Sequence, residues 1–164
     1  MNYEIITLPG YRAVGLKWEG TYSEITPHLK DTIRKMVERS IELEYRLDPH
    51  IQLGLSYHVI KNGFVHYSVY EVSNKQEVPN GMIEINVPTL KYVKTTHNNG
   101  EDIQNTYTNL HKCFFESDYL PYKEMGVDYY DSIPIKHERY PVDRDPNDPH
   151  FEIYIPIVKK KNTS

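Results

Sequence analysis

The sequence predicts an α+β fold of two similar halves, each with antiparallel strands and one helix, that share one sheet with pseudo-twofold symmetry. Segments rich in β-branched and aromatic residues alternate with two segments of helical periodicity. The order strand, strand, helix, strand, strand occurs twice, over about residues 1–73 and 80–158, and residues 64–72 weakly resemble residues 150–158. Because an antiparallel sheet can bury one face and leave the other free, we expect a ligand cleft between the halves.

The first half is expected to hold one helix between two pairs of strands. Thr26 followed by proline is typical of a helix start, and the apolar residues keep helical spacing to about Asp48. The Asn62-Gly63 dipeptide predicts a tight hairpin turn. The expected strands are residues 3–8, 12–18, 51–59 and 64–72.

The second half repeats this pattern after a polar linker at residues 73–80. A helix is expected over about residues 101–117, where Ile103, Tyr107, Leu110 and Phe114 keep helical spacing. The expected strands are residues 81–87, 90–96, 133–140 and 150–158, with a long loop at 118–131. The last two strands predict an antiparallel hairpin with a long, proline-rich connection.

Composition indicates one compact domain, residues 1–158, followed by a basic polar tail at 159–164. The formal charge is −4, from 19 basic and 23 acidic residues spread along the chain, which argues against direct binding to nucleic acid. No apolar run approaches the ~20 residues that span a bilayer, and the start lacks the pattern of a signal peptide. We therefore expect a cytoplasmic protein that does not bind membranes.

Several other chemistries have no support in the sequence. The single cysteine, Cys113, allows no internal disulfide, agrees with a reducing compartment and is expected to be an inert, buried thiol. The eight histidines include no closely spaced set of zinc ligands. Motifs for a nucleophilic triad or a phosphate-binding loop are also missing. We expect neither a metal nor a cofactor.

The candidate site rests on two carboxylates and a surplus of tyrosine. Glu138 and Glu152 lie one on each of the last two strands, and the chain has 15 tyrosines against four phenylalanines and one tryptophan. A tyrosine combines an apolar ring with a hydroxyl, which suits a pocket that is both apolar and hydrogen-bonding. We expect a trough on the sheet face opposite the helices, although a one-residue error in register would exchange the whole set. The predicted ligand-binding residues are Glu138, Tyr140, Tyr57, Tyr67, Trp18, Glu152 and Tyr154.

A family resemblance extends over nearly the whole chain. It rests on Leu8-Pro-Gly-Tyr-Arg-Ala-Val-Gly-Leu, Gly54-Leu-Ser-Tyr, Val78-Pro-Asn-Gly-Met-Ile-Glu-Ile-Asn-Val-Pro-Thr-Leu-Lys-Tyr-Val, His97-Asn-Asn-Gly, Lys136-His-Glu-Arg-Tyr and Phe151-Glu-Ile-Tyr-Ile-Pro-Ile. In this order the motifs resemble the GyrI-like small-molecule-binding superfamily, also called the AraC-type or bacterial transcription activator effector-binding domain. The resemblance implies a duplicated architecture with a ligand cleft, and a stand-alone member without a DNA-binding module. It also implies that Glu138 is the buried acid that meets ligands. The chain departs from the family at Phe114-Phe-Glu-Ser-Asp-Tyr-Leu-Pro, where members often carry a Trp-Leu-Pro step, so the shape of one pocket wall differs.

Physical chemistry gives Glu138 a function of its own. A carboxylate withdrawn from water gains from a ligand cation, and tyrosine faces add cation–π attraction, so a lipophilic cation is the expected ligand. The expected protein is a sensor or sequestering factor that binds such a small molecule and, as a sensor, passes the signal to a partner protein. A homodimer is the other assembly considered. The family resemblance also implies one alternative, a hydrolase that opens strained cyclopropane rings of DNA-alkylating natural products, in which Glu138 would act as the catalytic acid or base. A gyrase-interacting inhibitor is a second alternative, by family analogy only.

Overall fold

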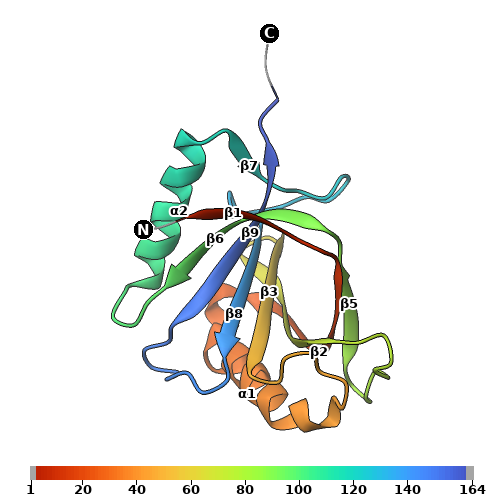
Figure 1. Cartoon of the computed structure of the whole chain (residues 1–164). Coiled ribbons are helices and arrows are strands. Elements are labelled where there is room, and N and C mark those ends of the chain that lie inside the picture. The colour runs from red at the N-terminus through yellow and green to blue at the C-terminus, as the bar shows by residue number, and fades with distance from the viewer. Residues whose placement is uncertain (1–2, 162–164) are drawn as a thin grey trace.

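Nine strands form a single antiparallel sheet in the computed structural model, which describes residues 3–161 (Figure 1). The strands are β1 (Glu4–Leu8), β2 (Tyr11–Thr21), β3 (Ile51–Ile60), β4 (Gly63–Val72), β5 (Ile83–Val87), β6 (Leu90–His97), β7 (Tyr119–Pro121), β8 (Ile135–Pro141) and β9 (Phe151–Lys159). The helices are α1 (Lys30–Arg39) and α2 (Ile103–Glu116). This architecture confirms the predicted α+β class. Within residues 3–161, no helix is long and apolar enough to cross a bilayer.

The strands of the two halves occupy equivalent positions on either side of the centre of the sheet. The sheet runs β1-β6-β9-β8-β3-β4-β2-β5, and β7 adds to β9. Hence β3 and β8, β4 and β9, and β2 and β6 take corresponding places on either side of the β3–β8 junction. The outermost strands cross over, because β1 pairs with β6 of the second half and β5 pairs with β2 of the first.

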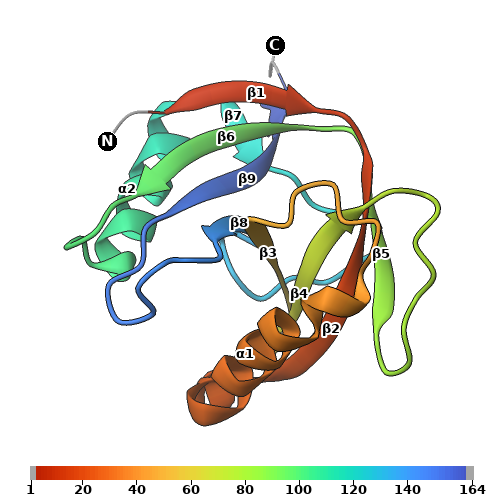
Figure 2. The same ribbon diagram turned by 60° about the horizontal axis from the view of Figure 1, so that its bottom comes forward.

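Both helices cover the same face of the sheet. Met36 of α1 packs against Tyr70 of β4, and Leu110 of α2 packs against Ile153 of β9. The cross-strand register runs from β4 through β3 and β8 to β9 without a change of face, so Tyr70 and Ile153 point to the same side. Figure 2 shows the two helices well separated, with β3 and β8 between them. These two strands are the floor between the helices.

Helix α1 is shorter than its apolar spacing predicts. It is regular only from Lys30 to Arg39, with a π-type turn before it and a single 3-10 turn after it, at Ser40–Glu42. The chain then turns inward so that Leu43 is fully buried against Met36, and Arg46 forms a β-bridge to β4. Burial of Leu43 and pairing of Arg46 with the end of β4 therefore replace the last turns of the predicted helix.

Helix α2 follows the prediction closely because both of its ends are satisfied. The Asp102 side chain accepts a hydrogen bond of 2.7 Å from the backbone N–H of Gln104, a standard N-cap. At the other end, the Lys160 ammonium donates to the carbonyls of Ser117 and Phe114, where the helix dipole favours a cation. Lys160 and the last residue of β9 thus belong to the fold, although the sequence assigns them to the tail. Residues 162–164 of that tail lie outside the described part.

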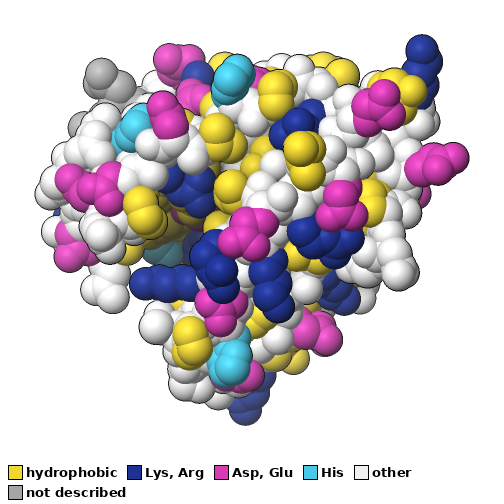
Figure 3. Space-filling model, turned by 90° about the horizontal axis from the view of Figure 1, so that it is seen from below, with side chains coloured by type: hydrophobic (Ala, Val, Ile, Leu, Met, Phe, Trp, Pro, Cys, Tyr) yellow, Lys and Arg dark blue, Asp and Glu magenta, His cyan; other side chains and the backbone are white. Residues whose placement is uncertain are grey.

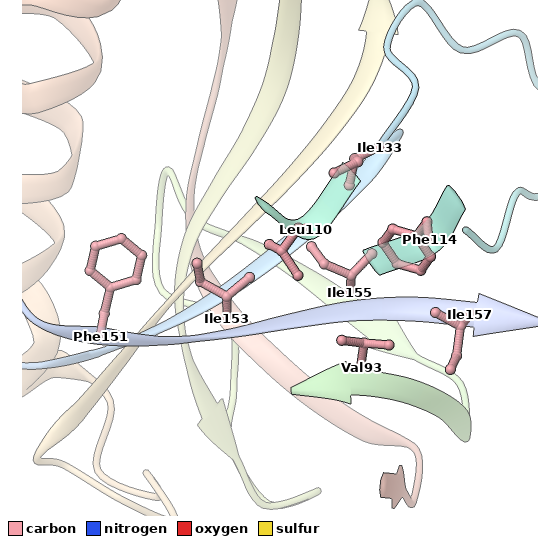
Figure 4. Packing of buried hydrophobic residues seen from close by; sticks show 8 residues of the cluster. All are labelled: Val93, Leu110, Phe114, Ile133, Phe151, Ile153, Ile155 and Ile157. Atoms are coloured by element: carbon pink, nitrogen blue, oxygen red, sulfur yellow. The ribbon is translucent and has the colours of Figure 1, made fainter. Parts of the chain in front are cut away.

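The hydrophobic cluster beneath α2 fixes the helix on the sheet. Leu110 and Phe114 point down onto the isoleucines of β9, as Figure 4 shows. The cluster consists of Val93, Leu110, Phe114, Ile133, Phe151, Ile153, Ile155 and Ile157. Helix α2 therefore holds its side chains at a fixed height above β8 and β9.

Replacing Leu110 by alanine should destabilise the protein, because Leu110 is fully buried at the centre of this cluster. We expect a loss of about 2–5 kcal/mol in the free energy of unfolding, measured by urea denaturation. The matched control is Phe115→Ala on the same helix, where the side chain is 88% exposed. That change should cost at most ~0.5 kcal/mol. Equal effects of the two variants would contradict the packing described here.

Candidate ligand-binding site

Glu138 lies at the centre of the helix-covered face. In β8 it pairs with Gly54 of β3 on one side and with Ile153 of β9 on the other. Gly54 pairs with Ser68 of β4, which pairs with Leu16 of β2. This row crosses the sheet between the two helices. The expectation that the acid would face away from the helices does not hold.

The sheet surface next to Glu138 is recessed because the residues there have small side chains. Gly54 has no side chain, and a Cβ there would lie 3.0 Å from the His66 ring and 3.1 Å from the Tyr140 ring. Glycine thus lets the two rings approach each other over the backbone of β3. The His66 ring is held by a hydrogen bond of 2.9 Å between its Nδ1 and the Ser56 hydroxyl.

Two tyrosine hydroxyls bind the carboxylate of Glu138. Tyr107, which α2 brings down from above, donates to Oε2 at 2.7 Å. Tyr140, two residues along β8, donates to Oε1. Among residues 3–161, no arginine, lysine or histidine forms an ion pair with this carboxylate, whose residue is half-buried. Its negative charge is therefore solvated by phenols and not neutralised by a contacting cation.

Burial and hydrogen bonding act on the site in opposite directions. Burial raises the pKa of the Glu138 carboxyl above its ordinary 4.5, while hydrogen bonds from Tyr140 and Tyr107 and the charge of Lys136 partly oppose the shift. Burial also raises the pKa of both tyrosines well above 10, and the adjacent carboxylate adds to this. Near neutral pH both phenols are therefore protonated donors. Burial lowers the pKa of His66 to about 4, so this ring is neutral at pH 7.

The two basic side chains nearest the acid are engaged elsewhere. The Lys136 ammonium lies 3.3 Å from Asp131 and 3.0 Å from the Nε2 atom of His58. Arg144 stacks over the outer face of Tyr140, with 4.5 Å from its Cζ atom to the ring centroid. Burial lowers the pKa of Lys136 and of Arg144. These cations therefore reinforce the wall around Glu138 without contacting its carboxylate.

An aromatic cluster extends the same face at the β2 end. Trp18 pairs with His66 across β2 and β4, which places its ring on the face of Gly54. Its ring centroid lies 5.4 Å from that of Phe64, and Phe64 in turn contacts Tyr22 and His58 at 5.8 and 5.2 Å. The site thus combines one carboxylate with a broad aromatic border.

The surface next to the acid is hollowed. Seen from below, the molecule has a recess with basic side chains at its rim and hydrophobic and histidine side chains deeper in (Figure 3). A pocket of about 340 Å³ adjoins Glu138 on the α2 side and is lined by its hydrogen-bond partner Tyr107 and by Lys136. Larger hollows lie elsewhere, at the β1–β6 edge and next to Tyr45. The residues that line those hollows include no buried charge comparable to Glu138.

A comparison with known families agrees with this geometry. The family model of the GyrI-like small molecule binding domain matches residues 1–158. The chain belongs to this family. The GyrI-like resemblance predicted from the sequence is thereby confirmed, as is the binding of small molecules as the family's general role.

Individual relatives show how far the GyrI-like likeness extends. The transcriptional regulator BrlR of Pseudomonas aeruginosa is 28% identical over 166 residues, which cover 96% of this chain and 56% of BrlR. The chain therefore spans about half the length of that regulator. The structure of SAV2435 bound to tetraphenylphosphonium superposes with a TM-score of 0.67 at 16% identity, covering 96% of this chain and 94% of the other. A hydrolase from Listeria innocua gives a TM-score of 0.60 at 12% identity, covering 95% and 91%. At these identities the two structures establish the fold alone.

The structure divides the predicted ligand-binding residues between the two faces of the sheet. Trp18, Glu138 and Tyr140 lie on the helix-covered face, with Trp18 on β2, three strands away from β8. The remaining residues, Tyr57, Tyr67, Glu152 and Tyr154, lie on the opposite face. Of these, Glu152 forms an ion pair with Lys94 at 2.8 Å, and the Tyr154 ring lies between Lys94 and Arg139.

Three residues of the site were not predicted from the sequence. Tyr107 was recognised only as an apolar position of the second helix, and Gly54 only as part of a family motif. His66 is only one of the eight histidines of the sequence. Their common feature is that the cross-strand register and the height of α2 bring them to Glu138, and neither is visible along the chain.

Other candidate chemistries find no site in the described part of the chain. Residues 3–161 contain no group of three or more His, Cys, Asp or Glu side chains that could hold a metal ion. Cys113 is half-buried, and burial raises the pKa of its thiol, so it is a poor nucleophile.

The raised pKa of Glu138 predicts a defined pH dependence of stability. A carboxyl whose pKa is higher in the folded state stabilises the fold fully below its ordinary pKa near 4.5, and this contribution is lost as pH rises through the raised value. Hence the free energy of unfolding of the wild type, minus that of Glu138→Gln, should fall between pH 4 and pH 8. The fall should amount to about 1.4 kcal/mol per unit of pKa shift. Urea denaturation of both proteins across this range measures the difference, and a constant or rising difference would exclude the raised pKa.

Proposed function

We propose that this protein binds a lipophilic cation at Glu138 and acts as a sensor or a sequestering protein for that ligand. The observation that carries the proposal is a half-buried carboxylate whose hydrogen-bond partners are two phenols and which has no contacting cation among residues 3–161. A ligand cation would supply the missing charge.

Physical chemistry favours a cation that is also apolar. Burial has already removed much of the water around Glu138, so pairing with a cation offsets that cost. The aromatic border around Trp18 adds roughly 0.5–2 kcal/mol per ring through cation–π contact. A small hydrated ion would leave this aromatic border unused. The tetraphenylphosphonium bound by SAV2435 has both required properties, a positive charge and apolar rings.

A sensing role is supported by the relative BrlR. BrlR is described as a transcriptional regulator, and this chain covers 56% of its length. A ligand domain of this kind converts binding into regulation when it is coupled to a second module or partner. A sequestering role requires only the binding site.

Replacing Glu138 by glutamine should lower the affinity for tetraphenylphosphonium roughly tenfold or more, because the charge partner is lost while the shape is kept. Trp18 is the single tryptophan and lies at the aromatic border, so its fluorescence can follow the titration. Wild-type affinity should rise between pH 5 and pH 8 as Glu138 ionises, and the variant should lose this dependence.

The matched control for this titration is Glu152→Gln, on the opposite face. It should leave the affinity within about twofold of the wild type. If Glu152→Gln weakens binding and Glu138→Gln does not, the cation binds on the other face and the proposal fails.

A second candidate function is hydrolysis. A carboxyl with a raised pKa and two phenol donors has the groups needed for general acid–base chemistry, and one protein of this fold is described as a hydrolase. The substrate that the family resemblance implies is a strained cyclopropane of a DNA-alkylating natural product.

Turnover separates hydrolysis from binding. Incubation with excess cyclopropane alkylator, followed by mass spectrometry, should give at most one captured equivalent per chain if the protein only binds. Catalytic opening would instead give many equivalents of the hydrolysed product, and Glu138→Gln should then abolish it while keeping the fold.

A further inference from the structure

We propose that the opposite face of the sheet carries a second small-molecule site, which binds small methylated ammonium ions of the choline type. This face contains a pocket of about 240 Å³. Its walls include Tyr57, Tyr67 and Tyr129, its apolar base includes Val65 and Ile85, and Glu124 is also part of its lining. The pocket is separate from the Glu138 site and does not depend on the function proposed for it.

The strand register separates this pocket from Glu138. Tyr57 of β3 pairs with Val65 of β4, and Tyr67 of β4 pairs with Leu55 of β3. These residues alternate with Gly54, which faces the helices, and therefore point the other way. A ligand in this pocket has the whole sheet between itself and the carboxylate of Glu138.

Tyr57 and Tyr67 form an aromatic corner. Their ring centroids lie 5.7 Å apart and the ring planes meet at 81°, so the two faces are nearly perpendicular. The hydroxyl of Tyr57 is hydrogen-bonded to Nε2 of His137 at 3.0 Å, which fixes the ring. Burial lowers the pKa of His137 to about 3, so this buried neighbour carries no charge near neutral pH. Perpendicular aromatic walls suit a compact ammonium group whose methyls contact more than one ring.

Glu124 gives the pocket its charge. Its backbone N–H approaches the Tyr129 hydroxyl at 3.4 Å, which places it at one wall. Burial is the main cause that raises the pKa of Tyr57 and of Tyr129, and the charge of the nearby Glu124 carboxylate adds to both shifts. Glu124 is exposed and has no ion pair among residues 3–161. The pocket therefore combines aromatic walls with one negative charge.

Other tyrosines on this face already contact a cation of the chain itself. Arg139 lies over the rings of Tyr154 and Tyr11, at 5.0 and 5.7 Å from their centroids. Within residues 3–161, no such cation lies over Tyr57 or Tyr67. Lys17 pairs with Tyr67 across the strands, but its ammonium lies 3.9 Å from Glu19 and does not line the pocket. These two rings are thus available to an external cation.

The size of the pocket selects among cations. About 240 Å³ accommodates a trimethylammonium head, whose methyl groups can contact the tyrosine rings and the apolar base. A doubly charged or strongly hydrated ion would not gain from these apolar contacts. We therefore assign the pocket to monovalent quaternary ammonium compounds.

Choline and its neutral carbon analogue dimethylbutanol, in which a tert-butyl group replaces the trimethylammonium group, test the proposal. Both are titrated into the whole chain while backbone amide chemical shifts are recorded. Choline should bind saturably with shifts at Tyr57, Tyr67 and Tyr129, and the neutral analogue should bind at least about fivefold more weakly. Tyr67→Leu and Glu124→Gln should each weaken choline binding by about fivefold, whereas Tyr67→Phe, which keeps the ring, should not.

Glu138→Gln is the control that separates the two sites, and it should leave choline affinity unchanged. Equal binding of choline and its neutral analogue would overturn the proposal, and so would choline binding that survives both Tyr67→Leu and Glu124→Gln. Since Glu124 is exposed, its variant tests the site even if Tyr67→Leu fails to fold. Choline shifts confined to Glu138 and its neighbours would also reject a second site.

Discussion

The pairing of β3 with β8 is the constraint on which the rest of the site depends. It joins the two halves and sets Gly54 directly beside Glu138. A shift of one residue would turn Glu138 to the other face and place the bulkier Leu53 or Leu55 beside it. Buried leucines on one face and small polar residues on the other hold the register, because only one alignment buries the leucines. The position of a single acid thus follows from the packing of a face that it does not touch.

Two opposing effects set the pKa of the Glu138 carboxyl. Burial disfavours its ionised form, and the phenols of Tyr107 and Tyr140 favour it. Tyr140 lies on β8, the same strand as Glu138, and Tyr107 lies on α2. The charge state of Glu138 therefore depends on the height of the helix, which the cluster around Leu110 and Phe114 fixes. The hydrogen bond from Tyr107 thus links the position of α2 to the charge state of the acid.

The fold was largely predictable from the sequence, whereas the site was predictable only in part. Alternation and the Asn62-Gly63 turn identify the strands, since these signals are local. The end of α1 was missed because burial of Leu43, a tertiary effect, replaces the regular helix. The division of the tyrosines between the two faces depends on the pairing and register of strands that are distant in the sequence. Local sequence patterns do not show this pairing. Glu138 was found because a family motif marks it, and Tyr107 was missed because its helical spacing is that of an ordinary core residue.

The crossing of the outermost strands restricts how the protein can move and how it can be divided. Each half has its edge strand supplied by the other, since β1 completes the second half and β5 completes the first. Cutting the chain in the linker at residues 73–80 would leave two fragments that each lack an edge and carry a strand without a partner. Such fragments should recover the fold only by associating with each other. For the same reason a rigid-body separation of the halves would have to break three sets of strand pairs at once, β1 with β6, β5 with β2 and β3 with β8.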